Sequence, residues 1–326
     1  MSWILDTPLS WLQNVAIQII KAGPVPKHVA FIMDGNRRYA VKLNKEKIEG
    51  HSQGFHKLAQ TLEWCRKIGI NEVTVYAFSI ENFKRSKEEV DKLLDLAREK
   101  FAQLLKEKDK LMKHGVCVRV IGKLSLLPPD IRKSIAEAML MTKDNNRAYL
   151  NVAFAYTARE EITNAVETVI TGVKKDLITV DDIDEELLSQ CMYLSQSPEP
   201  DILIRTSGEI RLSDFLLWQL GGTELHFTNV LWPEFNLWHL LMAVFLYQRK
   251  YYSLQAIHTE KLQSEQNANA TNIIRRLDFI EGKKNWLTQL ETYATISNRK
   301  NLSRRIDFFA DMKKNRMMQL ESYVTN

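Results

Sequence analysis

Short apolar runs alternate with longer helical patterns over most of this chain. The runs are nearly continuous in Val, Ile, Leu and Phe, and they lie at His28–Met33, Glu72–Phe78, Val116–Gly122, Tyr149–Tyr156, Asp201–Thr206 and Glu224–Thr228. Such runs indicate strands that are covered on both faces, because a half-solvated strand would alternate apolar and polar residues. Helical patterns lie between them, at Gly54–Ile68, Lys87–His114, Pro128–Lys143, Ala158–Gly172 and Phe235–Lys250. Repeated β-then-α units predict an α/β fold, a mostly parallel central sheet flanked by helices on both faces.

The α/β pattern occupies residues 24–252, and a separate N-terminal segment precedes it. Residues 1–23 predict an amphipathic helix, with Thr7 as its cap and Pro8 in its first turn. Its apolar stripe consists of Leu9, Trp11, Leu12, Val15 and Ile19. Two interpretations remain open for this helix, which either packs on the body of the protein or lies on a membrane surface.

A C-terminal extension, residues 253–326, lacks apolar runs and contains an internal repeat. The pattern of Arg275–Tyr293 recurs in Arg304–Tyr323. Neither copy can bury an apolar face alone, so we expect a helical extension that packs on itself or on another subunit.

The composition excludes several classes of protein. Lys and Arg total 45 against 40 for Asp and Glu, and so small a surplus does not indicate nucleic-acid binding. Cys65, Cys117 and Cys191 are far apart, which favours buried structural thiols over a metal site or a disulfide. The sequence has no apolar run of about 18 residues that could span a bilayer. Neither the phosphate loop of NTPases nor the glycine motif of nicotinamide enzymes is present.

Charged and small polar residues follow three of the predicted strands. They are Asp34, Gly35, Asn36, Arg37 and Arg38 after the first run, Ser79, Asn82 and Arg85 after the second, and Arg205, Arg211 and Ser213 after the fifth. Ligands bind at the carboxyl ends of the strands in an open parallel sheet. Five arginines gathered there need an anion, and their planar guanidinium groups match the oxygens of a diphosphate. Asp34 suits Mg²⁺, which binds through one carboxylate plus substrate phosphates, although Asp34 could instead pair with arginines in a structural network.

These strand-end residues resemble the motifs of the cis-prenyltransferases, the undecaprenyl and dehydrodolichyl diphosphate synthases. Met33–Ala40 reads MDGNRRYA and is similar to the family's MDGNGRWA, and Phe78–Arg85 is similar to FSxENxxR. Asp201–Gln219 resembles DLxIRTxGExRxSxFLLWQ, and Leu231–Glu234 matches a further family landmark. An acidic run at Asp181–Glu186 resembles the metal motif of trans-prenyltransferases, but the leucines after it favour the capped start of a helix.

The resemblance implies cis-prenyl chain elongation, in which isopentenyl diphosphate is condensed onto farnesyl diphosphate. The product would be a long-chain polyprenyl (dehydrodolichyl) diphosphate for dolichol synthesis and protein glycosylation, made at the cytoplasmic face of the endoplasmic reticulum membrane. The residues that would hold the allylic diphosphate are Gly35, Asn36, Arg37, Arg38, His51 and Arg85. Those that would hold isopentenyl diphosphate are Arg205, Arg211 and Ser213. The resemblance further implies Mg²⁺ at Asp34 and Glu224, and catalytic roles for Asp34, Ser79 and Asn82.

An apolar product requires an apolar tunnel, and the predicted helices Gly54–Ile68 and Lys87–His114 are its candidate walls. Lys47 stands where many family members have a phosphate-binding Arg. Single-subunit members also carry an Arg-x-Gly motif near their C-terminal end, and Gln248–Leu254 contains none. A Nogo-B-receptor-like subunit supplies these contacts in eukaryotic members, so we expect a heteromer in peripheral contact with a membrane, with this chain as its catalytic subunit. The alternative, a non-catalytic partner subunit, does not explain why Asp34 and the arginine clusters are present.

Overall fold

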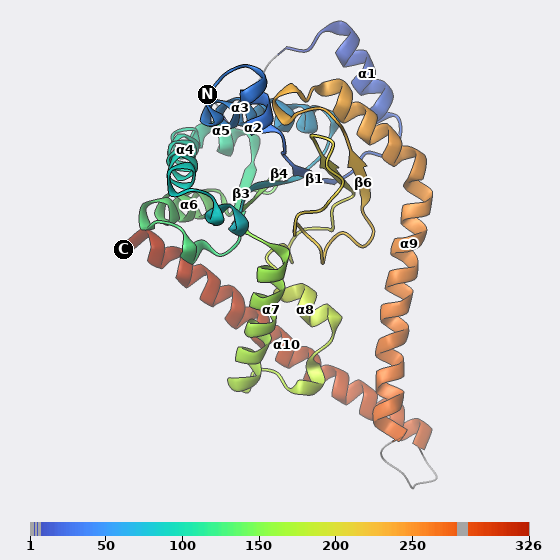
Figure 1. Cartoon of the computed structure of the whole chain (residues 1–326). Helices are drawn as coiled ribbons and strands as arrows, with labels where there is room; N and C mark the ends of the chain where they lie inside the picture. Colours follow the sequence, from blue (N-terminus) through green and yellow to red (C-terminus); the bar gives the residue numbers. More distant parts are fainter. Residues whose placement is uncertain (1–2, 4, 6–7, 279–285, 326) are drawn as a thin grey trace.

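A single sheet of six strands forms the centre of the computed structural model, which describes all residues except 1–2, 4, 6–7, 279–285 and 326, and side chains except those of 258 and 261–302. Its strands are β1 (His28–Ile32), β2 (Glu72–Ser79), β3 (Val116–Ile121), β4 (Ala148–Tyr156), β5 (Ile202–Arg205) and β6 (Glu224–Phe227). The order is β3-β4-β2-β1-β5-β6, and every pairing is parallel (Figure 1). All six predicted runs are therefore confirmed as strands of a parallel sheet.

The described helices agree with the predicted ones in most places. They are α1 (Trp11–Lys21), α2 (Asn36–Lys42), α3 (Lys47–Ile68), α4 (Lys87–Lys106), α5 (Lys108–His114), α6 (Pro129–Thr142), α7 (Ala158–Lys174), α8 (Glu185–Cys191), α9 (Leu237–Asp278) and α10 (Trp286–Thr325). Short 3₁₀ turns lie at Ile80–Lys84, Leu124–Leu126, Val180–Asp182 and Trp232–Glu234. The predicted helix Lys87–His114 is divided in two at Glu107, and Ser86 caps it by accepting a hydrogen bond from the Glu89 amide. Asp184 caps α8, which confirms the acidic run as the start of a helix.

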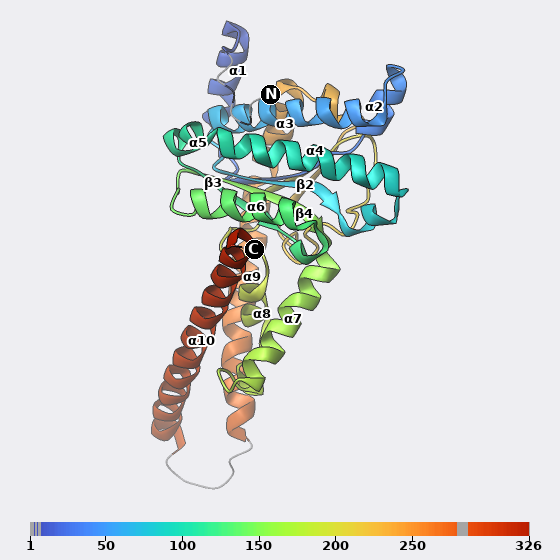
Figure 2. The ribbon, with the colours of Figure 1, turned by 90° about the vertical axis from the view of Figure 1, so that its left-hand side faces the viewer.

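Only one face of the sheet is covered mainly by helices, which corrects the expectation of helices on both faces. Val29, Phe31 and Val75 pack with buried residues of α3, α4, α6 and α9 on that face. On the other face Ala30 and Leu203 pack instead with residues of the segments before and after β5, such as Leu194, Phe215 and Leu216. Helices α7, α8 and α10 lie beyond these segments, around a separate apolar cluster (Figure 2).

The N-terminal helix differs from its prediction in both its cap and its buried face. Its cap is Ser10, whose hydroxyl accepts a hydrogen bond from the Gln13 amide, whereas Thr7 lies outside the described residues. Ile17 and Ile20 are buried in the core. By contrast, three members of the predicted stripe, Trp11, Leu12 and Ile19, are 78%, 57% and 68% exposed. The buried face is therefore displaced from the stripe that the sequence indicated.

The C-terminal extension is continuous with the body at one end and docks on it at the other. The predicted boundary at residue 252 falls within α9, which extends away from the sheet (Figures 1 and 2). The second copy of the repeat returns along α7 and α8, where Phe308 is buried and Arg304 forms an ion pair with Asp182. The copy at Arg275–Tyr293 lies outside the residues with described side chains. The second copy thus packs on the body of the protein. No helix in the described part of the chain is long and apolar enough to cross a bilayer.

Candidate active site

Two glycines of α3 allow α2 to approach closely and so fix the first set of charged residues. A Cβ atom added at Gly54 would lie 2.1 Å from the Oδ1 atom of Asn36, and one added at Gly50 would lie 2.2 Å from its carbonyl oxygen. Gly35, directly after β1, adopts a φ of +105°, which residues with side chains rarely adopt. The chain therefore turns sharply at Gly35 and continues as α2 against α3, with its arginines beside the carboxyl end of the sheet.

Asp34 lies at the centre of this edge, between the ends of β1 and β5. Its Oδ2 atom accepts a hydrogen bond from the Arg205 guanidinium at 3.0 Å, and its Oδ1 atom accepts one from the Gly35 amide at 2.7 Å. Arg38 lies 3.7 Å from Oδ1. One third of the Asp34 side chain is still exposed. Asp34 thus does pair with arginines, yet its carboxylate remains accessible from the cavity that it lines.

The arginine that follows β5 is buried and strongly held. Arg205 is 2% exposed, and it donates to the Ser213 hydroxyl at 2.8 Å and to the Arg211 carbonyl oxygen as well as to Asp34. Ser213 has a φ of +51°, a strained conformation that presents its hydroxyl to Arg205. Arg211 forms an ion pair with Glu209 at the exposed rim. The predicted isopentenyl set, Arg205, Arg211 and Ser213, is therefore brought together by a single loop.

A second group of cations surrounds one carboxylate, that of Glu89 in the first turn of α4. Arg85 lies 2.8 Å from it, Arg37 3.5 Å and Lys47 3.6 Å. The burial of His51, together with the charges of Arg85 and Arg37, lowers the pKa of its imidazole to about 4. His51 is therefore neutral near pH 7, and its buried Nε2 atom has no hydrogen-bond partner. These residues form a cluster with donors available for an anion.

Ser79 and Asn82 lie between the two groups of arginines and hold each other in place. The Asn82 Oδ1 atom accepts a hydrogen bond from the Ser79 amide at 3.0 Å, and the Ser79 hydroxyl accepts one from the Glu81 amide. This capping box belongs to the short 3₁₀ turn after β2. Both side chains line the cavity.

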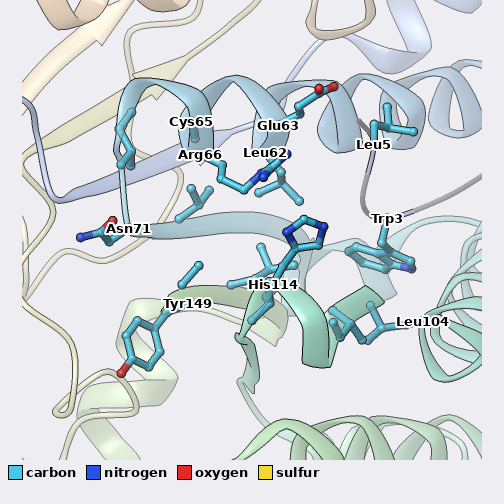
Figure 3. A pocket seen from close by; sticks show the side chains of 16 residues that line it. Trp3, Leu5, Leu62, Glu63, Cys65, Arg66, Asn71, Leu104, His114 and Tyr149 are labelled. Atoms are coloured by element: carbon cyan, nitrogen blue, oxygen red, sulfur yellow. The ribbon is translucent and has the colours of Figure 1, made fainter. Parts of the chain in front are cut away.

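The charged edge and an apolar interior form one cavity of about 1190 Å³. Its lining changes from the strand-end residues at the mouth to side chains of α3, α4, β2 and β4, among them Phe55, Leu58, Leu96, Phe101 and Phe154. The two predicted wall helices therefore do line it. Trp3 lies at the far end and also borders a separate apolar cavity of about 70 Å³ (Figure 3).

Glu224 lies at the opposite edge of the sheet from Asp34. It begins β6 beside Ile202, and its carboxylate binds the Lys250 ammonium at 2.8 Å. Glu224 is level with Val29 in the sheet, and Asp34 lies five residues beyond Val29, after the carboxyl end of β1. This offset corresponds to about 16 Å along the strand direction. The structure does not bring these two carboxylates into one site, and our placement of Glu224 with Asp34 is wrong.

Mg²⁺ fits this edge through a single protein carboxylate. Among the described residues, no cluster of three His, Cys, Asp or Glu side chains could hold a metal. Mg²⁺ often binds through one carboxylate and completes its coordination with substrate phosphates and water. Asp34, accessible and surrounded by the donors of Arg205, Arg38 and the Gly35 amide, has the chemistry for that arrangement.

Two cavity residues, Arg159 and Lys100, and one carboxylate beside the cavity, Glu89, escaped the sequence analysis. Arg159 follows β4 and forms an ion pair with Asp214 at the mouth, so the test of strand ends would have found it. Glu89 lies in the first turn of α4, four residues after Arg85, which precedes the helix cap Ser86, and the two side chains pair at 2.8 Å. Lys100 lines the deep part of the cavity, and no motif marks it.

Comparisons with known proteins agree with this geometry. The family model described as putative undecaprenyl diphosphate synthase matches residues 32–254. The chain is 59% identical over 255 residues to a human subunit of the dehydrodolichyl diphosphate synthase complex, covering 78% of this chain and 77% of the human one. It is 47% identical over 238 residues to a tritrans,polycis-undecaprenyl-diphosphate synthase (geranylgeranyl-diphosphate specific) from Pyrococcus abyssi, covering 73% and 90%.

Solved structures show the same fold. Lavandulyl diphosphate synthase from Lavandula x intermedia, in complex with dimethylallyl diphosphate, superposes with a TM-score of 0.65 at 34% identity, covering 69% of this chain and 95% of that one. A probable undecaprenyl diphosphate synthase from Campylobacter jejuni superposes with a TM-score of 0.57 at 31% identity, covering 69% and 96%.

Proposed function

This chain belongs to the cis-prenyltransferase family and elongates prenyl chains, and from that premise we propose its substrates, its metal and its partner. The proposed reaction condenses isopentenyl diphosphate onto farnesyl diphosphate and yields a long-chain dehydrodolichyl diphosphate for dolichol synthesis and protein glycosylation. The observation that carries it is one cavity with a cationic mouth and an apolar interior. A polyprenyl diphosphate has the same two parts.

The two groups of arginines suit two diphosphates. In the proposed arrangement, the α2 residues Gly35, Asn36, Arg37 and Arg38, with His51 and Arg85, hold the allylic diphosphate. The Arg205–Ser213 loop holds isopentenyl diphosphate. The pairs with Glu89 and Glu209 keep these guanidinium groups assembled before substrate binds. Donors fixed in advance stabilise a departing diphosphate without reorganisation.

Asp34 is the residue that would hold Mg²⁺, between the two proposed diphosphate sites. A bound Mg²⁺ would neutralise the negative charge that develops on the leaving diphosphate. Arg37, Arg38 and Arg85 stabilise the same charge through direct hydrogen bonds. Ser79 and Asn82, fixed to each other at the end of β2, orient the condensing carbons and assist loss of the proton from the isopentenyl unit.

A second subunit would complete the isopentenyl site. In support, β6 is an edge strand, and its Leu225 is 40% exposed. On α9, which contacts β6, Trp238, Met242 and Phe245 repeat at helical spacing and are 46%, 53% and 46% exposed. The names of two relatives describe them as complex subunits. We infer that a Nogo-B-receptor-like subunit covers this face and supplies the motif that Gln248–Leu254 lacks.

Peripheral attachment to the cytoplasmic face of the endoplasmic reticulum membrane is proposed from α1. Its exposed Trp11, Leu12 and Ile19 form an apolar surface, and the helix contains no acidic residue. Apolar helix faces of this kind insert shallowly into the boundary between lipid head groups and tails.

The test is incorporation of labelled isopentenyl diphosphate into farnesyl diphosphate in the presence of Mg²⁺. We expect long polyprenyl products when the receptor-like subunit is present and very little without it. Full activity from the single chain would refute the heteromer. No product in either case, with a folded complex, would refute the proposed substrates.

A further inference from the structure

A buried lysine interrupts the apolar lining of the cavity. Helix α4 lines the cavity with Leu93, Leu96, Ala97 and Phe101, and Lys100 lies among them. Only 7% of Lys100 is exposed, although lysine is almost never fully buried unless paired. The proposed mechanism does not use this residue.

The position of Lys100 is deep within the cavity. It follows Glu89, which binds the cations at the mouth, by eleven residues of the same helix, a rise of about 17 Å. Its ammonium lies 4.9 Å from the centre of the Phe55 ring, and its carbonyl oxygen accepts a hydrogen bond from the Trp3 indole at 2.9 Å. Trp3 and Phe55 also touch edge to face. Lys100 therefore belongs to the group of side chains that closes the far end.

A surface ion pair does not explain why Lys100 is buried. Its ammonium lies 2.7 Å from the carboxylate of Glu99, which is the adjacent residue and is 66% exposed. Adjacent residues of a helix do not face each other, so this contact draws the amine sideways from the cavity wall. The contact with the Phe55 ring also holds the ammonium at the end of the cavity.

We propose that Lys100 is a specificity-determining residue that limits the length of the prenyl product. Each condensation adds only carbon and hydrogen to the chain inside the cavity. Apolar surface placed against this ammonium offers no hydrogen-bond acceptor and competes with its contact to the Phe55 ring. Growth past Lys100 is therefore disfavoured, and the product is released more often at that length. This inference rests on the proposed function.

The decisive variant is Lys100→Met, which removes the charge and keeps the length of the side chain. The assay uses the chain with its receptor-like partner subunit, farnesyl diphosphate and labelled isopentenyl diphosphate, and it separates the products by length. We expect the distribution to shift by about one isoprenyl unit or more toward longer chains, since added methylene groups favour an uncharged apolar wall. The first condensation should keep its rate, because it occurs at the mouth.

Matched variants separate charge from shape and from general effects. Lys100→Arg keeps the charge and should not lengthen the products, and Lys106→Met, an exposed residue at the end of the same helix, should leave the distribution unchanged. If circular dichroism shows that Lys100→Met does not fold, Lys100→Gln takes its place as the neutral variant. It is expected to shift the product lengths in the same direction. Unchanged or shorter products from a folded, active neutral variant would overturn the proposal. A wild-type complex that makes no prenyl product would instead refute the proposed function.

Discussion

Charged residues lie at both edges of the sheet, but their polar atoms have hydrogen-bond partners to different extents. At the amino edge, Glu72 accepts a hydrogen bond from Asn151 and lies 3.6 Å from Arg119, while His28 contacts Thr74 and the Pro198 carbonyl oxygen. At the carboxyl edge, Asn36, His51, Arg205 and Ser207 each retain a buried polar atom without a partner. Among the described residues of the amino edge just named, only Asn151 does so.

This difference separates a structural network from a binding site better than the number of charges does. Buried polar groups without partners cost free energy unless a ligand satisfies them. The amino edge is closed largely by its own hydrogen bonds, whereas the carboxyl edge keeps several buried polar atoms, such as the Arg205 Nε donor, without a partner. Glu224 illustrates the point, because its carboxylate lies at the amino edge and already binds Lys250.

The largest expected effect compares one carboxylate from each edge. Asp34→Asn should lower kcat by about 10³-fold, since a preorganised charged group at the reacting diphosphate is lost. Glu224→Gln should leave kcat within a small factor of wild type. Steady-state kinetics with a circular dichroism control measures both variants. Equal losses from the two substitutions would remove the distinction between the edges.

The next effect depends on backbone approach rather than charge. Gly50→Ala places a methyl group 2.2 Å from the Asn36 carbonyl oxygen and must displace α2, so turnover should fall by about 10²-fold. Gly221→Ala is the matched control, because no atom lies within 4 Å of its added Cβ atom. Wild-type turnover from folded Gly50→Ala would show that the position of α2 is unimportant.

Two arginines test the comparison with a smaller effect. Arg205→Ala should raise the KM for isopentenyl diphosphate by about 30-fold, as expected when one partner of a buried charge pair is truncated. Arg119→Ala, at the amino edge, should lower the Tm by a few degrees and leave KM unchanged, because it loses contacts with Glu72 and the Tyr149 ring. A selective rise in the KM for the allylic substrate in Arg205→Ala would exchange the two proposed diphosphate sites.

The smallest effects concern two buried histidines. Burial lowers the pKa of His28 in the folded protein. As the pH falls below 6.5, His28 is therefore protonated in the unfolded chain before it is protonated in the folded one. Stability should therefore decline from pH 6.5 downward, and less steeply in His28→Gln, as thermal melts would show. A slope that is the same in both proteins would exclude His28 as its source.

His51 should affect binding instead. Its pKa of about 4 reflects burial and two arginines, with Glu89 opposing them, and a bound diphosphate raises it. Between pH 6.5 and 4, the affinity for pyrophosphate should then rise in the wild type relative to His51→Asn, by less than about tenfold. Calorimetry in buffers of different ionisation enthalpy should detect the proton that the wild type takes up on binding. Identical proton uptake in wild type and variant would contradict this role.

The sequence by itself determined the elements and most of the site. Continuous apolar runs identified all six strands, because burial on both faces leaves a local pattern that needs no knowledge of neighbours. The motif residues from Asp34 to Ser213 follow strands β1, β2 and β5, which are neighbours in the sheet. Because parallel strands have their carboxyl ends at the same edge of the sheet, these residues lie at one edge.

Only the tertiary structure decided what depends on long-range pairing. Strand order and register offset Glu224 from Asp34 by about 16 Å along the strand direction, and packing against α9 buried Ile17 and Ile20 rather than the predicted stripe of α1. The tertiary structure also placed Lys100 at the closed end of the cavity. The helical periodicity of α4 does not indicate that a charged side chain is buried at this position. Local periodicity states which residues are buried, whereas the contacts between distant segments decide what each of them faces.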